Sequence, residues 1–551
     1  MAAFPFPAGA RFDVVVVGGG IIGAGVARDA ALRGLSVALA EQSDFGSGTT
    51  AGSTRLIHGG LRYLEMLDFR LVRMDLRERE TLLRIAPHLV KPLEFLVPFY
   101  DRSLFYRAQL RVGMRLYDAL SYDRSLPGHR FLGARETLAA EPRLCERGLQ
   151  GAAAYFDAQV NSPERLCLEN IVDARRHGAV PLNYTTVTGA VCAGDGAWTV
   201  RLRHTRTGAD TTLRARVVVN ASGPWFDRVA TSLAPHPGPL IRTTKGIHVA
   251  AASASRSAVV LFAGDGRLFF VIPWLGYSWI GTTDTDFADD PARARATPED
   301  VAYLLHAASP FFPCLRTGEV YWSNAGVRAL VRKPGKESSV SRLHRIVDGA
   351  DAGAPGLISI AGGKITGYRA IAEEAVDLVC RKLGSEAKCR TAAESLPGAL
   401  AAPAGRAPSH LESLYGARAD EVESLAREDP ALAQPLAPDS PDVAAQVIHA
   451  VRQEHCVRLA DFLLRRTLLG FRPDQGVKTM LAVAPLMAAE LGWTALETAA
   501  EIEHYRTWVA ESQAFRDGAG SAAGPRPESP RDPSAGAPTA SSDTGGPSAG
   551  A

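Results

Sequence analysis

The fold of this chain is decided by the stretch Asp13-Val14-Val15-Val16-Val17-Gly18-Gly19-Gly20-Ile21-Ile22-Gly23. Its four consecutive valines predict a β-strand that is buried on both faces. Gly18, Gly20 and Gly23 stand at the G-x-G-x-x-G spacing, and the alanine-rich residues 24–33 predict a helix behind them. A buried strand, a glycine turn and a helix in this order predict a Rossmann-like α/β domain.

Each of these glycines has a separate task in such a turn. Gly18 allows the tight turn, Gly20 lets a pyrophosphate approach the backbone, and Gly23 lets the helix pack against the strand. A second strand is predicted at 36–40, and Glu41 follows it, where a carboxylate can accept hydrogen bonds from ribose hydroxyls. The complete order predicts a bound dinucleotide without a 2′-phosphate; the alternative is a glycine turn that binds no ligand.

Length and composition limit the classes of protein to consider. A chain of 551 residues is expected to form two or three domains, and 46% hydrophobic with 22% charged residues is ordinary for a globular protein. A net charge of +2 argues against a large nucleic-acid-binding surface. The first ten residues show no secretory signal, and no apolar run reaches the length of a membrane-spanning helix.

The cysteine pattern indicates a reducing compartment. The seven cysteines are scattered, odd in number and free of any C-x-x-C pair. That pattern argues against a disulfide framework and against a zinc site. We therefore expect a cytoplasmic protein that holds no metal, and contact with a membrane surface stays compatible with the sequence.

A second ligand-type region follows the predicted nucleotide turn. The small polar residues 47–54 can let the backbone approach a flat or phosphorylated ligand. Directly behind them, His58 precedes two glycines, and Arg62 and Tyr63 follow. This combination is rarely assembled for packing alone, although a surface charge and an interface aromatic would explain the last two residues one by one.

In two later segments, a predicted buried strand is again followed directly by small residues. In residues 217–225, Ala221 and Gly223 favour a cofactor contact over an ordinary strand end. In residues 357–369, paired glycines precede a predicted helix, which would place the N–H groups of Gly363 and Lys364 at a helix start. Such donors would stabilise negative charge.

Two segments predict charged helices. The arginines and glutamates of residues 70–86 are expected to form a solvated face. Residues 104–120 carry Arg107, Arg111 and Arg115 at helical i, i+4 spacing beside apolar residues. That pattern suits a helix resting on anionic lipid, and a helix that faces ordinary solvent explains it equally well.

The remaining patterns predict the outer parts of the chain. Residues 242–286 alternate between apolar and polar positions, which predicts a largely antiparallel sheet as a lid or floor over the nucleotide domain. Residues 411–508 have helical periodicity throughout. The tail after Phe515 contains no Leu, Ile, Val, Met or aromatic residue and is expected to be disordered.

With these motifs in view, the sequence resembles the FAD-dependent glycerol-3-phosphate dehydrogenases, the aerobic, quinone-reducing enzymes of glycerol catabolism. The resemblance spans roughly residues 12–470, and its most particular motif is the run from Leu56 to Leu64. The other matching segments are 17–23, 220–225, 272–274, 280–284, 326–328 and 362–369.

The resemblance implies an α/β fold with a Rossmann-like FAD-binding domain, a mainly antiparallel substrate (cap) domain and an all-helical C-terminal domain. The FAD-dependent oxidoreductase domain is expected in 1–390 and the helical domain in 391–515, before a disordered tail at 516–551. Within the first, nucleotide-binding parts are expected near 12–65, 150–225 and 320–385, and cap parts near 70–150 and 240–320.

The implied reaction is oxidation of sn-glycerol 3-phosphate to dihydroxyacetone phosphate, with hydride transfer from C2 to FAD and electrons passed to membrane quinone. It suits a protein on the inner face of the cell membrane, and a homodimer is compatible with it. The alternatives are an oxygen-using glycerol-3-phosphate oxidase, a related amine or amino-acid oxidase, and a non-catalytic flavin-binding regulatory protein.

The resemblance also assigns roles to residues. Arg62 and Arg328 are expected to clamp the substrate phosphate, a task that suits guanidinium groups, although a structural ion pair is an equally common use of Arg328. Tyr63, Lys364 and Thr366 are expected at the substrate or the flavin edge. The predicted FAD-binding positions are Gly18, Gly20, Gly23, Glu41, Thr49, Ser53, His58, Val187, Ala221, Gly223, Gly363 and Lys364.

The reaction needs a base for the C2 hydroxyl proton. His58 has the right intrinsic pKa, and Lys364 and His248 compete with it. The chain departs from the family pattern near the expected pocket at Ile247, Leu343 and Gly367, where a small polar residue, an aspartate and a second threonine are common. These departures bear on the substrate rather than on the flavin.

Overall fold

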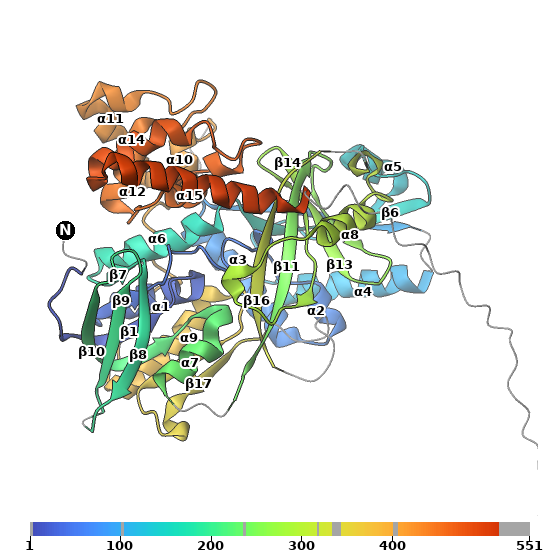
Figure 1. Cartoon of the computed structure of the whole chain (residues 1–551). Helices are drawn as coiled ribbons and strands as arrows, with labels where there is room; N and C mark the ends of the chain where they lie inside the picture. Colours follow the sequence, from blue (N-terminus) through green and yellow to red (C-terminus); the bar gives the residue numbers. More distant parts are fainter. Residues whose placement is uncertain are drawn as a thin grey trace, which may run out of the picture.

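The computed structural model describes residues 4–100, 104–194, 196–234, 238–316, 319–332, 343–399 and 406–516. Two β-sheets lie side by side in the molecule, and a group of helices from the C-terminal part packs above them (Figure 1). The tail predicted as disordered lies, from residue 517 on, outside the described residues.

The first sheet is built around the quoted stretch. Val14, Val15 and Val16 are fully buried in β1, which pairs in parallel with β2 and β10. Valines can be buried on both faces here because helices α1, α6 and α9 cover one face and the β8–β9 hairpin covers the other. The main strands, in spatial order, are β17 (Arg345–Asp348), β18 (Leu357–Ala361), β10 (Asp210–Asn220), β1 (Ala10–Val17), β2 (Val37–Ala40) and β7 (Val180–Leu182). The covering elements are α1 (Ile21–Leu32), α6 (Pro163–Arg176), α9 (Tyr368–Leu383), β8 (Thr185–Cys192) and β9 (Trp198–His204).

The second sheet is mainly antiparallel, as the alternating pattern predicts. Within its main path only β12 and β4 pair in parallel among the described strands. In spatial order it holds β15 (Thr285–Asp286), β11 (Ile241–Ala252), β14 (Tyr277–Gly281), β13 (Leu268–Trp274), β12 (Ala258–Phe262), β4 (Val90–Tyr100), β6 (Leu149–Val160) and β3 (Leu56–Ile57). At its sides β16 (Val320–Val331) pairs with β11 and β5 (Arg130–Gly133) pairs with β6.

Five helices accompany this sheet: α2 (Arg62–Glu65), α3 (Phe69–Ile85), α4 (Leu104–Leu120), α5 (Ala134–Ala140) and α8 (Pro298–Ala308). The expectation that the charges of α3 form a solvated face is wrong for part of the helix. Glu78 and Arg79 are buried, where Glu78 pairs with Arg369 at 2.6 Å and Arg79 pairs with Asp157 at 2.5 Å. The reason is that α3 packs against both α9 and β6, so its charges find partners on neighbouring elements.

The C-terminal part is helical, as predicted. Its helices are α10 (His410–Tyr415), α11 (Ala419–Glu428), α12 (Ala444–Gln453), α13 (Leu459–Asp461), α14 (Met480–Leu491) and α15 (Ala495–Gln513). They pack on the second sheet through a cluster that contains Trp274, Trp322 and Phe471, and α15 runs from this group toward α8 (Figure 1).

Helical structure does not run through this part without a break. His455 has a positive φ of 53°, so the chain is not helical there. The N–H groups of Val457 and Arg458 both donate to Oδ2 of Asp461 at 2.9 Å, and α13 begins only at Leu459. Among the described residues, no helix combines the length and apolar character needed to cross a bilayer.

Candidate active site

A cavity of about 1210 Å³ lies between the two sheets. It exceeds the roughly 300–1,000 Å³ of sites that hold one small molecule. All but one of the catalytic and FAD-binding residues predicted from the sequence line it. They lie on loops that follow strands of both sheets, on helix α2, and on strands β8 and β16. The lining members of that set are Gly18, Gly20, Glu41, Thr49, Ser53, His58, Arg62, Tyr63, Val187, Ala221, Gly223, Arg328, Gly363, Lys364 and Thr366.

The exception, Gly23, lies behind the cavity wall and shapes the turn that lines it. A Cβ atom on Gly23 would lie 1.9 Å from the carbonyl oxygen of Gly18, and one on Gly18 would lie 2.7 Å from the carbonyl oxygen of Ala221. Gly18 also has a φ of +106°, which favours glycine. At Gly20, by contrast, a Cβ would meet only Oγ1 of Thr50, at 3.5 Å. The turn is therefore closed toward the sheet and open toward the cavity, as a pyrophosphate requires.

Replacing Gly23 by alanine is expected to reduce bound flavin at least tenfold, because the added methyl group forces the turn away from β1. The measurement is flavin absorbance per mole of purified protein. Gly264→Ala is the matched control, since a Cβ there meets no atom within 4 Å and Gly264 does not line the cavity. Equal flavin content in both variants would contradict the assigned role of the turn.

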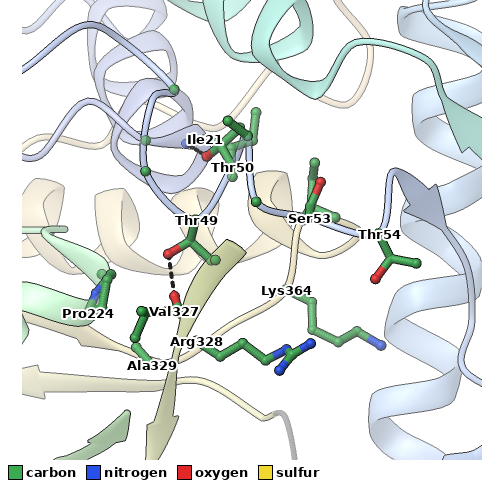
Figure 2. A pocket seen from close by; sticks show the side chains of 18 of the residues that line it. Ile21, Thr49, Thr50, Ser53, Thr54, Pro224, Val327, Arg328, Ala329 and Lys364 are labelled. Carbon is green, nitrogen blue, oxygen red and sulfur yellow. Dashed lines mark hydrogen bonds between the residues drawn. The ribbon is translucent and has the colours of Figure 1, made fainter. Parts of the chain in front are cut away.

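Hydroxyl groups hold the loop of residues 47–54 in place. Oγ1 of Thr50 accepts a hydrogen bond from the backbone N–H of Ile21 at 3.1 Å, at the start of α1 (Figure 2). Oγ1 of Thr49 donates to the carbonyl of Val327 at 2.6 Å, which ties the loop to β16 (Figure 2). Oγ of Ser53 accepts from the N–H of Arg55 at 3.3 Å. The sequence did not single out Thr50, and nothing distinguishes it locally from its neighbours.

Glu41 lies at the nucleotide end of the cavity. Its carboxylate accepts hydrogen bonds from the N–H groups of Gly19 at 2.7 Å and Ser43 at 2.9 Å. Burial raises the pKa of Glu41, against the effect of these two bonds. Each oxygen keeps a further lone pair, so the fixed carboxylate can still accept from a ligand hydroxyl.

Two cationic side chains extend into the other part of the cavity, Arg328 from β16 and Lys364 from the loop after β18 (Figure 2). The guanidinium of Arg328 donates to Oγ1 of Thr282 at 2.6 Å and to the carbonyl of Thr283 at 3.2 Å. It also pairs with Asp284 at 3.2 Å. These contacts fix the guanidinium at the cavity wall before any ligand arrives.

Lys364 is held from two sides. Its Nζ lies 4.5 Å from the ring centroid of Tyr63 and forms an ion pair with Asp75 of α3. Asp75 is fully buried. The sequence did not single it out, because the charge pattern of this helix is made by its arginines and glutamates. The partner that keeps it inside comes from a loop almost 290 positions later in the chain.

His58 is held through its backbone. Its N–H donates to Oγ1 of Thr366 at 3.2 Å. Burial and the positive charge of Lys364 lower the pKa of His58 to about 3, so its imidazole is neutral at pH 7 and keeps a free lone pair. A neutral imidazole at the cavity wall can accept a proton.

His248, the other histidine considered as a base, does not line the cavity. It is buried, stacks on Trp279 at a centroid distance of 5.0 Å, and its Nε2 lies 3.0 Å from Oγ1 of Thr54. Burial and nearby arginines hold the pKa of His248 well below its ordinary value. It lies behind the lining residue Thr54 and stays a competing candidate for the base.

The expectation that Gly363 and Lys364 stand at a helix start is wrong. Gly362 and Gly363 have φ values of +74° and +104°, which an α-helix does not contain. Helix α9 therefore begins only at Tyr368, and the two predicted donors lie on the preceding loop. Both still line the cavity.

The three departures from the family pattern do not line the cavity. Ile247 is fully buried within the core of the second sheet. Leu343 lies two residues before β17. Gly367 packs beneath the site, where a Cβ would lie 3.1 Å from Cε of Met74 and 3.4 Å from Oδ1 of Asp75. These positions leave the groups that face a ligand unchanged.

The sequence of this chain is similar to those of known proteins. The FAD dependent oxidoreductase family matches residues 13–369, and the C-terminal domain of alpha-glycerophosphate oxidase matches residues 371–498. A glycerol-3-phosphate dehydrogenase of Synechocystis sp. is 38% identical, in an alignment that covers 93% of this chain and 99% of that protein.

Two solved structures are similar to this one. The glycerol-3-phosphate dehydrogenase from Bacillus halodurans complexed with FAD aligns with a TM-score of 0.74 and 31% identity, over 91% of this chain and 95% of that chain. The L-alpha-glycerophosphate oxidase from Mycoplasma pneumoniae with FAD bound aligns with a TM-score of 0.54 over 70% of this chain and 99% of that chain. At 19% identity the second shows a shared fold.

The residues present fit FAD as the cofactor. The turn at Gly18 and Gly20 leaves room for a pyrophosphate, Glu41 presents a fixed carboxylate, and the cavity is large enough for a dinucleotide together with a small substrate. The predicted fold class and cofactor are thereby confirmed. The chain belongs to the FAD-dependent oxidoreductases, within the glycerol-3-phosphate dehydrogenase family.

Proposed function

We propose that this protein oxidises sn-glycerol 3-phosphate to dihydroxyacetone phosphate and passes the electrons to a quinone. One observation carries the proposal: a single cavity is lined both by the dinucleotide turn and by the side chains of Arg62, Arg328 and Lys364. Cationic side chains of this kind suit a dianionic phosphate. The names of the relatives support the same substrate.

For the cofactor, the open face at Gly20 would receive the pyrophosphate and Glu41 the ribose hydroxyls. Thr49, Ser53, Val187, Ala221, Gly223 and Gly363 would complete the wall. Bound FAD supplies the hydride acceptor for the reaction.

For the substrate, Arg62 and Arg328 would bind the phosphate. Because Arg328 is already fixed by its neighbours, it would lose little freedom when the substrate binds. Tyr63 and Lys364, which lie against one another, would flank the glycerol part. This arrangement would hold C2 in one orientation.

For the proton, neutral His58 would accept the C2 hydroxyl proton on an imidazole nitrogen as the hydride leaves C2. Thr366 would keep the loop of His58 in register through its hydrogen bond to the backbone. The pKa of about 3 applies without substrate. A bound phosphate dianion would raise the basicity of the imidazole, because opposite charge favours the protonated form.

A second candidate is oxidation with oxygen as the acceptor. The match of residues 371–498 to the C-terminal domain of alpha-glycerophosphate oxidase favours it. Product analysis with a water-soluble quinone under nitrogen, and hydrogen peroxide release in air, would separate the two. We expect dihydroxyacetone phosphate in equal amount to reduced quinone, and little peroxide. Peroxide at the rate of product formation would favour the oxidase, and oxidation of glycine or proline instead would reject the substrate.

Helix α4 supports the quinone proposal. It lines one end of the cavity through Leu110 and Leu116, while Arg111 and Arg115 on the same helix are exposed. An apolar acceptor dissolved in lipid could approach from this side if α4 rests on an anionic membrane surface. Peripheral membrane contact, a homodimer and the division of the chain at about residue 390 stay predictions.

Replacing Arg107, Arg111 and Arg115 by glutamate is expected to reduce partitioning onto anionic liposomes at least tenfold, since each basic residue near such a surface contributes about 1 kcal/mol. Co-sedimentation with liposomes at low and high salt measures it. Unchanged partitioning would count against the helix as the contact. A matched control changes three exposed arginines on other elements: Arg203, Arg406 and Arg427.

A further inference from the structure

Asp75 is the most unusual charged group near the site. It is fully buried on α3, does not line the cavity and pairs with Nζ of Lys364, which does. Among the described residues, neither oxygen of its carboxylate has a hydrogen-bond donor in good geometry apart from this ion pair. A buried carboxylate without compensation costs several kcal/mol, so the carboxylate and the ammonium depend on each other.

The other charged groups around Asp75 are already paired. On α3 itself Glu78 binds Arg369 of α9, and Arg79 binds Asp157 of β6. The remaining titratable groups that face this region are His58 on the loop after β3, Tyr63 of α2 and Tyr117 of α4. The hydroxyl of Tyr117 donates to Asp157 at 2.7 Å. Lys364 is therefore the cation that neutralises the charge of Asp75.

The glycine at residue 367 strengthens this dependence. A side chain at this position would begin 3.4 Å from Oδ1 of Asp75. A hydroxyl group could then donate to the carboxylate. Because this chain has Gly367, no such donor exists.

The same lysine acts on His58, since its positive charge lowers the pKa of that residue. We propose that Asp75 is a positioning residue that fixes Lys364 and offsets its charge, so that the ammonium can bind the substrate without preventing proton acceptance at His58. This inference rests on the proposed function and adds Asp75 to it.

The titration of Asp75 supports the proposal. Burial raises the pKa of Asp75 to about 6, with Lys364 opposing this effect and Glu78 and Asp157 adding to it. Asp75 is thus ionised at pH 7 and becomes protonated as the pH falls through about 6. Flavin reduction should slow over the same range. The substrate phosphate also titrates near pH 6, so a variant is needed to separate the two groups.

The test is Asp75→Asn in the FAD-loaded full chain, with anaerobic flavin reduction by sn-glycerol 3-phosphate followed by stopped flow from pH 5 to 9. We expect the limiting rate at pH 7.5 to fall about tenfold or more, while the substrate Kd is unchanged or lower because the full charge of Lys364 then attracts the substrate dianion. The acidic limb of the limiting rate that belongs to Asp75 should disappear. A rate and pH profile that superpose on those of the wild type would overturn the proposal.

Two controls make the result specific. Glu78→Gln removes a buried charge one turn along α3, but its partner Arg369 does not line the cavity, so stability should fall while the limiting rate at pH 7.5 stays unchanged. Because Glu78 helps to raise the pKa of Asp75, the acidic limb should move to lower pH in this variant and not disappear. In a Lys364→Met background, Asp75→Asn should have no further effect on the rate. An undiminished effect there would show that Asp75 does not act through Lys364. If Asp75→Asn alone does not fold, the double variant, which removes both charges of the pair, still supplies this comparison.

A readout without substrate keeps this proposal distinct from the proposed function. A carboxyl whose folded pKa is raised stabilises the fold below its unfolded pKa, and this contribution is lost as the pH rises through about 6. When the pH is lowered from 7 to 4, the thermal midpoint of the wild type should therefore rise relative to the midpoint of Asp75→Asn. If the substrate does not reduce the flavin of the wild type, the proposed function fails. A difference in thermal midpoint between the wild type and Asp75→Asn that does not change with pH would separately reject the raised pKa of Asp75.

Discussion

Replacing Arg328 by methionine is expected to lower kcat/KM for sn-glycerol 3-phosphate by about 100-fold or more. Hydrogen bonds to charged groups contribute about 1.5–3 kcal/mol each, and a guanidinium can make two to one phosphate. Because Thr282, Thr283 and Asp284 hold the side chain in advance, most of the loss should appear in the substrate Kd. Titration of flavin reduction against substrate concentration measures it.

The comparison needs two further proteins. Arg328→Met leaves the carboxylate of Asp284 without this partner, so Asp284→Asn should be added in a double variant to separate substrate binding from local repulsion. Arg242→Met is the matched control, since Arg242 of the adjacent strand β11 pairs with Asp286 and does not line the cavity. A substrate Kd within twofold of the wild type in Arg328→Met would contradict the phosphate clamp.

Replacing His58 by alanine is expected to slow flavin reduction in a single turnover by about 10²–10⁴-fold, the usual contribution of a positioned general base. Flavin content and substrate Kd should change little, because the backbone N–H that binds Thr366 is retained. Anaerobic stopped-flow absorbance separates these quantities. His129→Ala, in a histidine that pairs with Asp118 away from the cavity lining, controls for loss of an imidazole.

Near-normal reduction in His58→Ala would exclude His58 as the base and leave Lys364 as the candidate that lines the cavity. The pH profile offers an independent check. With a pKa of about 3 for His58 in the free protein, kcat/KM should show no acidic limb from this residue above about pH 4. A limb near pH 6 is instead expected from Asp75 and from the phosphate of the substrate.

Local spacing explains why much of the fold could be predicted. Four valines followed by Gly18, Gly20 and Gly23 leave few alternative folds for this segment. The backbone of the glycine turn approaches the end of β10 and helix α1 more closely than any side chain permits. Alternation in residues 242–286 likewise favours the antiparallel pairs that dominate the second sheet. The cavity follows from these elements, since its wall is formed by loops that leave the strands.

Charges whose partners lie far away in the chain could not be predicted. The helical period of α3 separates its faces but does not reveal that part of the charged face is covered. The prediction of a solvated face therefore fails at Glu78, and Asp75 was not singled out. Their partners, Lys364 and Arg369, come from a segment that the fold brings beside α3. The start of α9 was missed because the pattern does not reveal the left-handed backbone at Gly363.

The central claim is that the cavity holds FAD and presents it to a phosphorylated alcohol. Its most direct test is the visible absorption spectrum of the purified protein before and after anaerobic addition of sn-glycerol 3-phosphate. We expect a yellow protein with one FAD per chain whose flavin absorbance bleaches when the substrate is added. A colourless protein that takes up no FAD, or a yellow one whose spectrum the substrate leaves unchanged, would contradict the account.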